Sequence, residues 1–191
     1  MATAAASSGS GPPKFAILIT YVLLGCAISF LLGREPGRLP EDIALELAPS
    51  IIVIGIFLTH YSLWDCMAVG AAKQEFQKSW SGKIYREYNQ LQIPEQVYLA
   101  QRVQSNQLEQ LPVFLAGILS SAMLVNGLLA AIMGLAWTIL RMRYAYVYRH
   151  SVGMQYDHVM SRLVQYTIPA YFLSNSMLVA ATIHALRLLI N

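Results

Sequence analysis

Long apolar stretches alternate with shorter polar segments along most of this 191-residue chain. A helix needs roughly 20 apolar residues to cross the hydrocarbon core of a bilayer, and several of the stretches reach that length. The pattern therefore predicts an all-α integral membrane protein. The candidate spans are expected at about 15–33, 43 or 47–72, 95–125, 128–148 and 162–190.

The N-terminal part of the chain differs from the rest. Residues 1–14 are mostly Ala, Ser, Gly and Pro, which is typical of a disordered tail. The apolar stretch at 15–33 is either a retained membrane helix or a signal peptide. It is long for a signal peptide and no small-residue cleavage motif follows it, so we favour a retained helix or uncleaved anchor. Residues 47–190 then form a four-helix membrane domain.

Lysine and arginine gather in alternate polar segments, and this distribution predicts the orientation. Cytoplasmic segments of membrane proteins are enriched in these residues. We therefore expect Lys14, the loop at 73–95 and the segment 141–162 to face the cytosol. The opposite side carries only Arg34, Arg38 and Arg187.

Composition supports a membrane protein and argues against nucleic-acid binding and metal binding. Only 12% of the residues are charged, against roughly 25% in soluble domains, and this deficit is typical of a membrane protein. The net charge is +3 and no basic cluster is interleaved with aromatic residues, so a nucleic-acid surface is not expected. Cys26 and Cys66 lie in apolar stretches without metal-ligand spacing, which predicts neither a metal site nor a disulfide framework.

A polar stripe marks the span at 95–125. Arg102, Asn106 and Glu109 follow one another at offsets of four and three residues, so they share one face of a helix. The apolar run after them, 111–125, is too short to span alone, and the helix must draw part of this stripe into the membrane. Ionisable groups at that depth usually mark a functional interior.

A second stripe lies on the next span, where Arg141, Tyr144 and Tyr148 recur at offsets of three and four. The turn at 126–127 is almost minimal, so the two helices must be neighbours, with both stripes at the cytosolic end. Together they suit a small zwitterionic, peptide-like ligand, because arginines bind carboxylates and a carboxylate binds an ammonium group. The alternative is an internal salt-bridge network that only orients the helices.

Polar residues elsewhere in the spans carry a simpler interpretation. Asp65 must face the protein interior or find a partner, because a lipid-facing carboxylate is costly. We expect it and His60 to make packing contacts between helices rather than to act in catalysis. Pro112 is expected to kink its helix.

Two motifs resemble the family of membrane-associated proteins in eicosanoid and glutathione metabolism (MAPEG). They are R-x-x-x-N-x-x-E followed by Pro-Val-Phe, at 102–114, and G-L-A-W…R-x-R-Y-x-x-x-Y, at 134–148. The resemblance covers about 49–189 and leaves the first apolar stretch outside. It implies a four-helix bundle that assembles as a homotrimer in the endoplasmic reticulum or another endomembrane.

The resemblance also implies that glutathione is the co-substrate and binds between subunits, on the cytosolic side. No metal is implied. Gln104 and Arg141 correspond to supporting positions, and Lys73 is the nearest candidate for a basic contact at the end of the preceding helix. The glutathione contacts carried over from the family are Arg102, Asn106, Glu109, Tyr144 and Tyr148.

This chain departs from the family pattern at three positions. Gln155 stands where leukotriene C4 synthase and related transferases have an arginine that stabilises the thiolate. An amide supplies no positive charge, so Gln155 should lower a thiol pKa less than arginine does. Gln107 stands where the prostaglandin E synthases have an acidic residue, which argues against that activity, and Gln110 replaces a tyrosine of leukotriene C4 synthase.

The resemblance implies a glutathione transferase, with glutathione peroxidase activity as a related possibility. Arg102, Asn106 and Glu109 would hold the peptide, while Tyr148, Arg141 and Gln155 would lie near the sulfur. The acceptor would be a lipophilic electrophile or fatty-acid derivative arriving from the bilayer. Two alternatives remain open: a non-catalytic scaffold of the same family that binds lipid or glutathione, and a small transporter. A transporter predicts internal repeats, and the sequence contains none.

Overall fold

A computed structural model describes residues 19, 23, 41–79 and 94–190 of the chain. The chain divides into two compact units, residues 1–38 and 39–191, and the helices below belong to the second unit. Apart from residues 19 and 23, the expected tail and the first expected span lie outside the described residues.

The first long helix of this unit consists of three consecutive segments. They are α2 (Glu41–His60), the π-helical turn η1 (Tyr61–Cys66) and α3 (Met67–Ser79). The prediction that the loop begins at residue 73 is therefore wrong, because Lys73 still lies on α3. Residues 71–79 of α3 contain no glycine or proline and are mostly good helix formers, so the helix continues past the apolar stretch.

A tight turn joins the next two helices, α4 (Glu95–Leu124) and α5 (Gly127–Arg149). Between them, the Asn126 side chain accepts a hydrogen bond of 2.8 Å from the backbone N–H of Leu129 and so caps α5. The predicted short turn and the two neighbouring helices are confirmed. Pro112 lies within α4, as expected.

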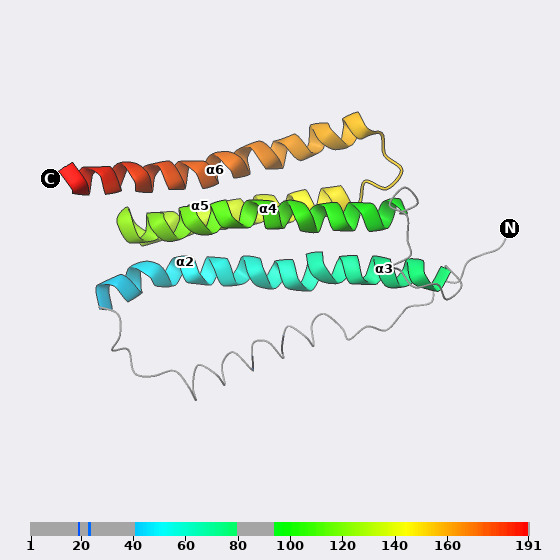
Figure 1. Cartoon of the computed structure of the whole chain (residues 1–191), viewed down its shortest axis with the longest axis horizontal. Coiled ribbons are helices and arrows are strands. Elements are labelled where there is room, and N and C mark those ends of the chain that lie inside the picture. Colours follow the sequence, from blue (N-terminus) through cyan, green and yellow to red (C-terminus); the bar gives the residue numbers. More distant parts are fainter. Residues whose placement is uncertain (1–18, 20–22, 24–40, 80–93, 191) are drawn as a thin grey trace. The chain divides into compact units, whose positions relative to one another are not determined.

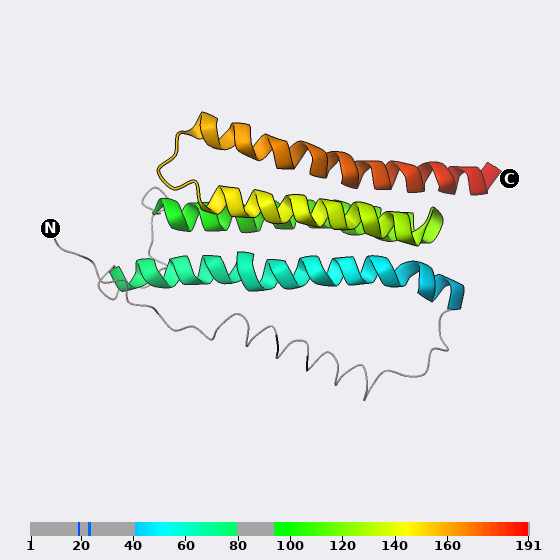
Figure 2. The same cartoon turned by 180° about the vertical axis from the view of Figure 1, so that it is seen from behind.

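The last helix, α6 (Tyr156–Ile190), begins about one and a half turns before the expected start of the span at 162. The polar residues that follow Gln155 contain no helix breaker, and they extend the helix beyond its apolar part. In Figures 1 and 2 the four long helices run side by side, with α4 and α5 between α2 and α6. Both central helices contact both outer ones.

Aromatic side chains hold the centre of the bundle together. The rings of Phe114 and Trp137 are parallel, with centroids 3.9 Å apart, and Phe57 meets Trp137 edge-on at 5.0 Å. Ile118 and Met177 extend this cluster, and all five side chains are at most 1% exposed. The described part of the chain contains four helices long and apolar enough to cross a membrane. The predicted fold class, an all-α membrane bundle, is confirmed.

Close contact between α2 and the start of α5 leads to the first prediction. The Cβ atom of an alanine at position 127 would overlap the main-chain carbonyl of Glu46, and the Gly127 N–H donates to the Glu46 carboxylate at 2.6 Å. We expect Gly127→Ala to lower the free energy of unfolding by about 1–3 kcal/mol, the usual penalty for overpacking. The change is measured as a lower unfolding midpoint. Gly70→Ala is the matched control, because nothing lies within 4 Å of its added Cβ. An equal effect of both changes on the midpoint would contradict this packing.

Candidate functional site

The polar stripe on α4, made of Arg102, Asn106 and Glu109, lies on one exposed face of the helix. The Arg102 and Glu109 side chains are 50% and 56% exposed, and Nη1 of Arg102 lies 4.0 Å from Oε1 of Glu109. Asn106 lies between them and is partly buried. The face therefore offers a cation and a carboxylate to a ligand, with an amide between them.

Arg141 on α5 points into the protein, where its guanidinium binds α4. The side chain is 1% exposed. Its Nε donates to Oε1 of Gln107 at 2.8 Å, and its Nη2 donates both to the backbone carbonyl of Asn106 at 3.1 Å and to the Asn106 side-chain oxygen. With the Oδ1 of Asn106 held in this way, the amide NH₂ of Asn106 is the part left to face a ligand. This geometry suits Arg141 to position Asn106 better than to hold a carboxylate itself.

The two tyrosines of the α5 stripe continue from Arg141 toward the end of the bundle. Tyr144 is 5% exposed, and its ring centroid lies 4.6 Å from the guanidinium carbon of Arg141. Tyr148 is half-buried, with its ring centroid 5.7 Å from that of Tyr144. The predicted α5 stripe therefore forms a continuous row of contacts, packed against α4 through Arg141.

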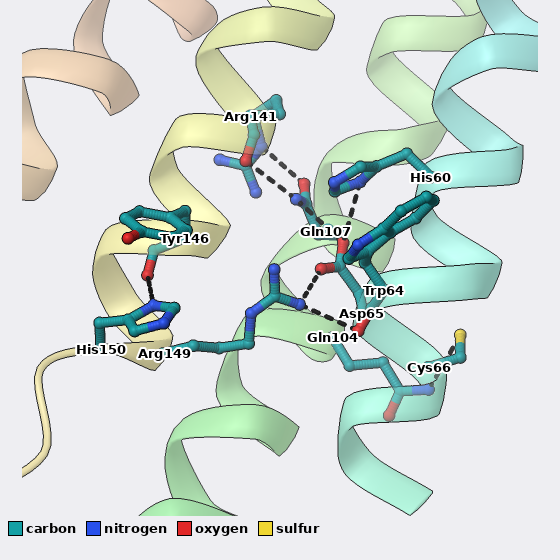
Figure 3. A network of polar contacts seen from close by, with 10 residues as sticks. All are labelled: His60, Trp64, Asp65, Cys66, Gln104, Gln107, Arg141, Tyr146, Arg149 and His150. Atoms are coloured by element: carbon teal, nitrogen blue, oxygen red, sulfur yellow. Dashed lines mark hydrogen bonds and ion pairs between the residues drawn. The ribbon is translucent and has the colours of Figure 1, made fainter. Parts of the chain in front are cut away.

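A buried ion pair lies beside this row, on the other side of Gln107 (Figure 3). The side chain of Asp65, in η1, is fully buried, and its Oδ1 accepts from Nη1 of Arg149 at 2.6 Å. The same Nη1 donates to the carbonyl of Trp64 at 3.0 Å, and His60 Nδ1 lies 3.9 Å from Oδ2 of Asp65. The expectation that Asp65 makes a packing contact between helices is confirmed.

Gln107 joins the ion pair to the α4 stripe. Its Nε2 donates to Oδ2 of Asp65 at 3.4 Å and to the backbone carbonyl of Arg141 at 3.2 Å, and the side chain is fully buried. A polar chain therefore runs from Asp65 through Gln107 and Arg141 to Asn106, and we call it the buried network. The need of Asp65 for a partner was the one signal in the sequence, and it did not identify Gln107 or Arg149.

The remaining predicted site residues lie around this centre. Gln104 occupies a different face of α4 from Asn106, and its Nε2 donates to Sγ of Cys66 at 3.5 Å. Lys73 is partly buried on α3. Gln155 is exposed at the start of α6, where its carbonyl accepts from the Val159 N–H at 3.2 Å.

The loop before Gln155 is anchored to the start of α4. Both carboxylate oxygens of Glu95 accept from the Gly153 N–H, at 3.1 and 3.2 Å. Gly153 has a φ of 72°, a conformation that favours glycine. A cavity of about 280 Å³ lies beside this loop, lined by Glu95, Tyr148 and Ser151 and by apolar side chains including Met154. This cavity, which the sequence did not predict, extends the site from Tyr148 toward the residues before Gln155.

The family model for the MAPEG family matches residues 51–186, which include most of all four long helices. The chain belongs to the MAPEG family. No curated protein and no solved structure matches the sequence.

Membership places this MAPEG protein among the membrane-associated proteins of eicosanoid and glutathione metabolism, and the four long helices agree with an integral membrane protein. Among the described residues, no group of three or more His, Cys, Asp or Glu side chains could hold a metal ion. The donors and acceptors that α4 presents, a guanidinium, an amide and a carboxylate, instead fit an amino-acid-like ligand.

Proposed function

We propose that this MAPEG protein is a membrane-bound glutathione transferase, with lipophilic electrophiles or fatty-acid derivatives as acceptors. The observation that carries the proposal is the exposed α4 stripe together with the buried network behind it. Arg102 and Glu109 present opposite charges to solvent, and Arg141 fixes the amide between them. The guanidinium, the amide and the carboxylate together match the charged ends and the amide group of a small peptide.

Each group of the stripe has a distinct role in binding glutathione. The Arg102 guanidinium binds a carboxylate of the peptide, and Glu109 accepts from its ammonium group. The amide NH₂ of Asn106 donates to a peptide carbonyl. Tyr148 then lies at the end of the α5 stripe, where its hydroxyl donates to the glutathione sulfur and favours the thiolate. A free thiol has a pKa near 8.5, so such stabilisation raises the nucleophilic fraction at neutral pH.

The setting of the site is part of the same proposal. Lysine and arginine are concentrated at the end of the bundle that carries Tyr148 and Gln155, which supports a cytosolic position for this end. Assembly as a homotrimer in an endomembrane, with glutathione between subunits, follows from the family resemblance. Gln104, which lies on a different face of α4 from the exposed stripe, and Lys73 on α3 are then contacts for the glutathione of a neighbouring subunit.

A non-catalytic scaffold of the same family is the second candidate. Gln155 favours it, because this residue is uncharged and lies exposed at the start of α6. A site without a cation near the sulfur could bind glutathione and leave its thiol protonated. The two candidates therefore share the binding site and differ in what happens to the thiol.

Glutathione binding to the purified protein, followed by turnover of a generic aromatic electrophile, separates the two candidates. We expect saturable binding and measurable turnover. Binding without turnover would select the scaffold, and no binding would exclude the transferase and a glutathione-binding scaffold.

The variant Gln155→Arg tests the role assigned to Gln155. A guanidinium near the sulfur stabilises the thiolate, so we expect more thiolate in the bound glutathione, measured by its ultraviolet absorbance. Gln165→Arg is the matched control, because Gln165 is also exposed on α6 but lies almost three turns further along. An unchanged absorbance in Gln155→Arg would mean that the thiolate is stabilised elsewhere.

A further inference from the structure

A second cavity lies on another part of the surface, where η1 approaches the end of α5. Its volume is about 310 Å³. In Figure 3 the stacked rings of His60 and Trp64 lie on one side, Tyr146 lies on the other, and the Arg149 side chain reaches between them. Arg143 also lines this cavity, which shares no lining residue with the cavity beside Tyr148.

The charge of this cavity is positive. The charge of Arg149 is neutralised by Asp65, which is fully buried and whose Oδ1 lies 2.6 Å from Nη1 of Arg149. Arg143 is exposed, and within the described part of the chain no carboxylate lies within ion-pair distance of it. None of the residues lining the cavity is acidic. A guanidinium therefore remains available for an anion.

An apolar track leads along α5 to this cavity. Ile132, Leu135 and Ile139 recur at offsets of three and four, so they share one face, and they are 58%, 42% and 52% exposed. Ile139 itself lines the cavity, and Arg143 follows one turn further along. Trp64 and Tyr146 line the same cavity, and these two residue types are enriched at the depth in a membrane where the lipid headgroups begin.

We propose that this cavity binds the phosphate of an anionic phospholipid, with an acyl chain along the exposed face of α5. Arg143 supplies the bidentate donor pair that matches two phosphate oxygens. The cavity has room for a headgroup, because its volume of about 310 Å³ is many times the roughly 30 Å³ that one water molecule occupies in the liquid. Basic pockets at the ends of membrane helices recognise such headgroups in this way. The proposal is independent of the proposed transferase activity, because no residue of the α4 stripe takes part.

The test measures lipid binding to the full-length protein in detergent, by native mass spectrometry. The probes are dioleoyl phosphatidylglycerol, whose only charge is its phosphate, dioleoyl phosphatidylcholine and oleate. We expect saturable binding of phosphatidylglycerol and a dissociation constant about fivefold higher in Arg143→Gln, the effect of one arginine near an anionic headgroup. Arg162→Gln is the matched control, because Arg162 is exposed on α6 and does not line the cavity; we expect it to change the constant by less than twofold.

Three results would overturn the proposal. Equal binding of phosphatidylcholine would show that the anionic headgroup is not recognised. An equal loss in both variants would show that phosphatidylglycerol senses only the general surface charge. Oleate binding as tightly as phosphatidylglycerol at the same cavity would identify a carboxylate ligand instead. The unfolding midpoint of each variant, measured without added lipid, shows whether a loss of binding reflects a loss of fold.

Discussion

Replacing Glu109 by glutamine is expected to weaken glutathione binding by at least about tenfold while the bundle stays folded. The change removes the negative charge that receives the ammonium group of the ligand, and a charge-assisted hydrogen bond contributes roughly 1.5–3 kcal/mol. Arg102→Ala should weaken glutathione binding by a similar factor, because it removes the guanidinium that binds a carboxylate of the ligand. Calorimetric titration of the purified protein with glutathione measures both.

Stability should hardly change in these variants. Arg102 and Glu109 are half exposed and 4.0 Å apart, and an exposed pair contributes at most about 1 kcal/mol. Ser105→Ala is the matched control for binding, because Ser105 is exposed on the same turn of α4 but lies off the stripe. Normal binding by both charge variants would show that glutathione binds elsewhere.

The second large effect is expected at the buried ion pair. Arg149→Met leaves the carboxylate of Asp65 buried without its guanidinium, and we expect the free energy of unfolding to fall by about 3 kcal/mol or more. Adding Asp65→Leu to the same chain removes the unpaired charge and should restore most of the loss, because a well-packed apolar pair often replaces a buried ion pair without penalty. Reversible unfolding in mixed micelles measures the single and double variants.

Additivity decides whether this interpretation is correct. If the two side chains interact directly, the loss of stability in the double variant must be smaller than the sum of the two single losses. If the two single losses add up in the double variant, the side chains have no interaction energy with each other and the interpretation is wrong. Arg162→Met is the control for removal of an exposed arginine, and we expect a change within about 0.5 kcal/mol.

Most of the fold could be predicted from local pattern. Apolar runs near the length of a bilayer predicted the four spans, and the residues at 126–127 predicted the turn between α4 and α5. The helix ends were less accurate, as Lys73 and Tyr156 show. A bilayer sets how long the apolar part must be, but a helix continues into water for as long as its residues favour it.

Part of the candidate site could be predicted from the sequence, and part depends on how the helices pack. Helical periodicity alone placed Arg102, Asn106 and Glu109 on one face, and the contact between Arg102 and Glu109 agrees with this. Whether these residues bind glutathione stays a prediction. The hydrogen bonds from Arg141 to Asn106 and Gln107 could not be predicted, because they join two helices whose relative rotation no local pattern specifies.

The sequence by itself therefore predicted a four-helix membrane domain of the MAPEG family with a polar stripe on α4, and the family model agrees. Only the tertiary structure decided which polar groups are buried together and which remain open to a ligand. The π-helical turn at 61–66 and the register between α4 and α5 bring Asp65, Gln107 and Arg141 into one network. Partners more than thirty residues apart meet only when the packing of whole helices brings them together, and that packing depends on every side chain in the core.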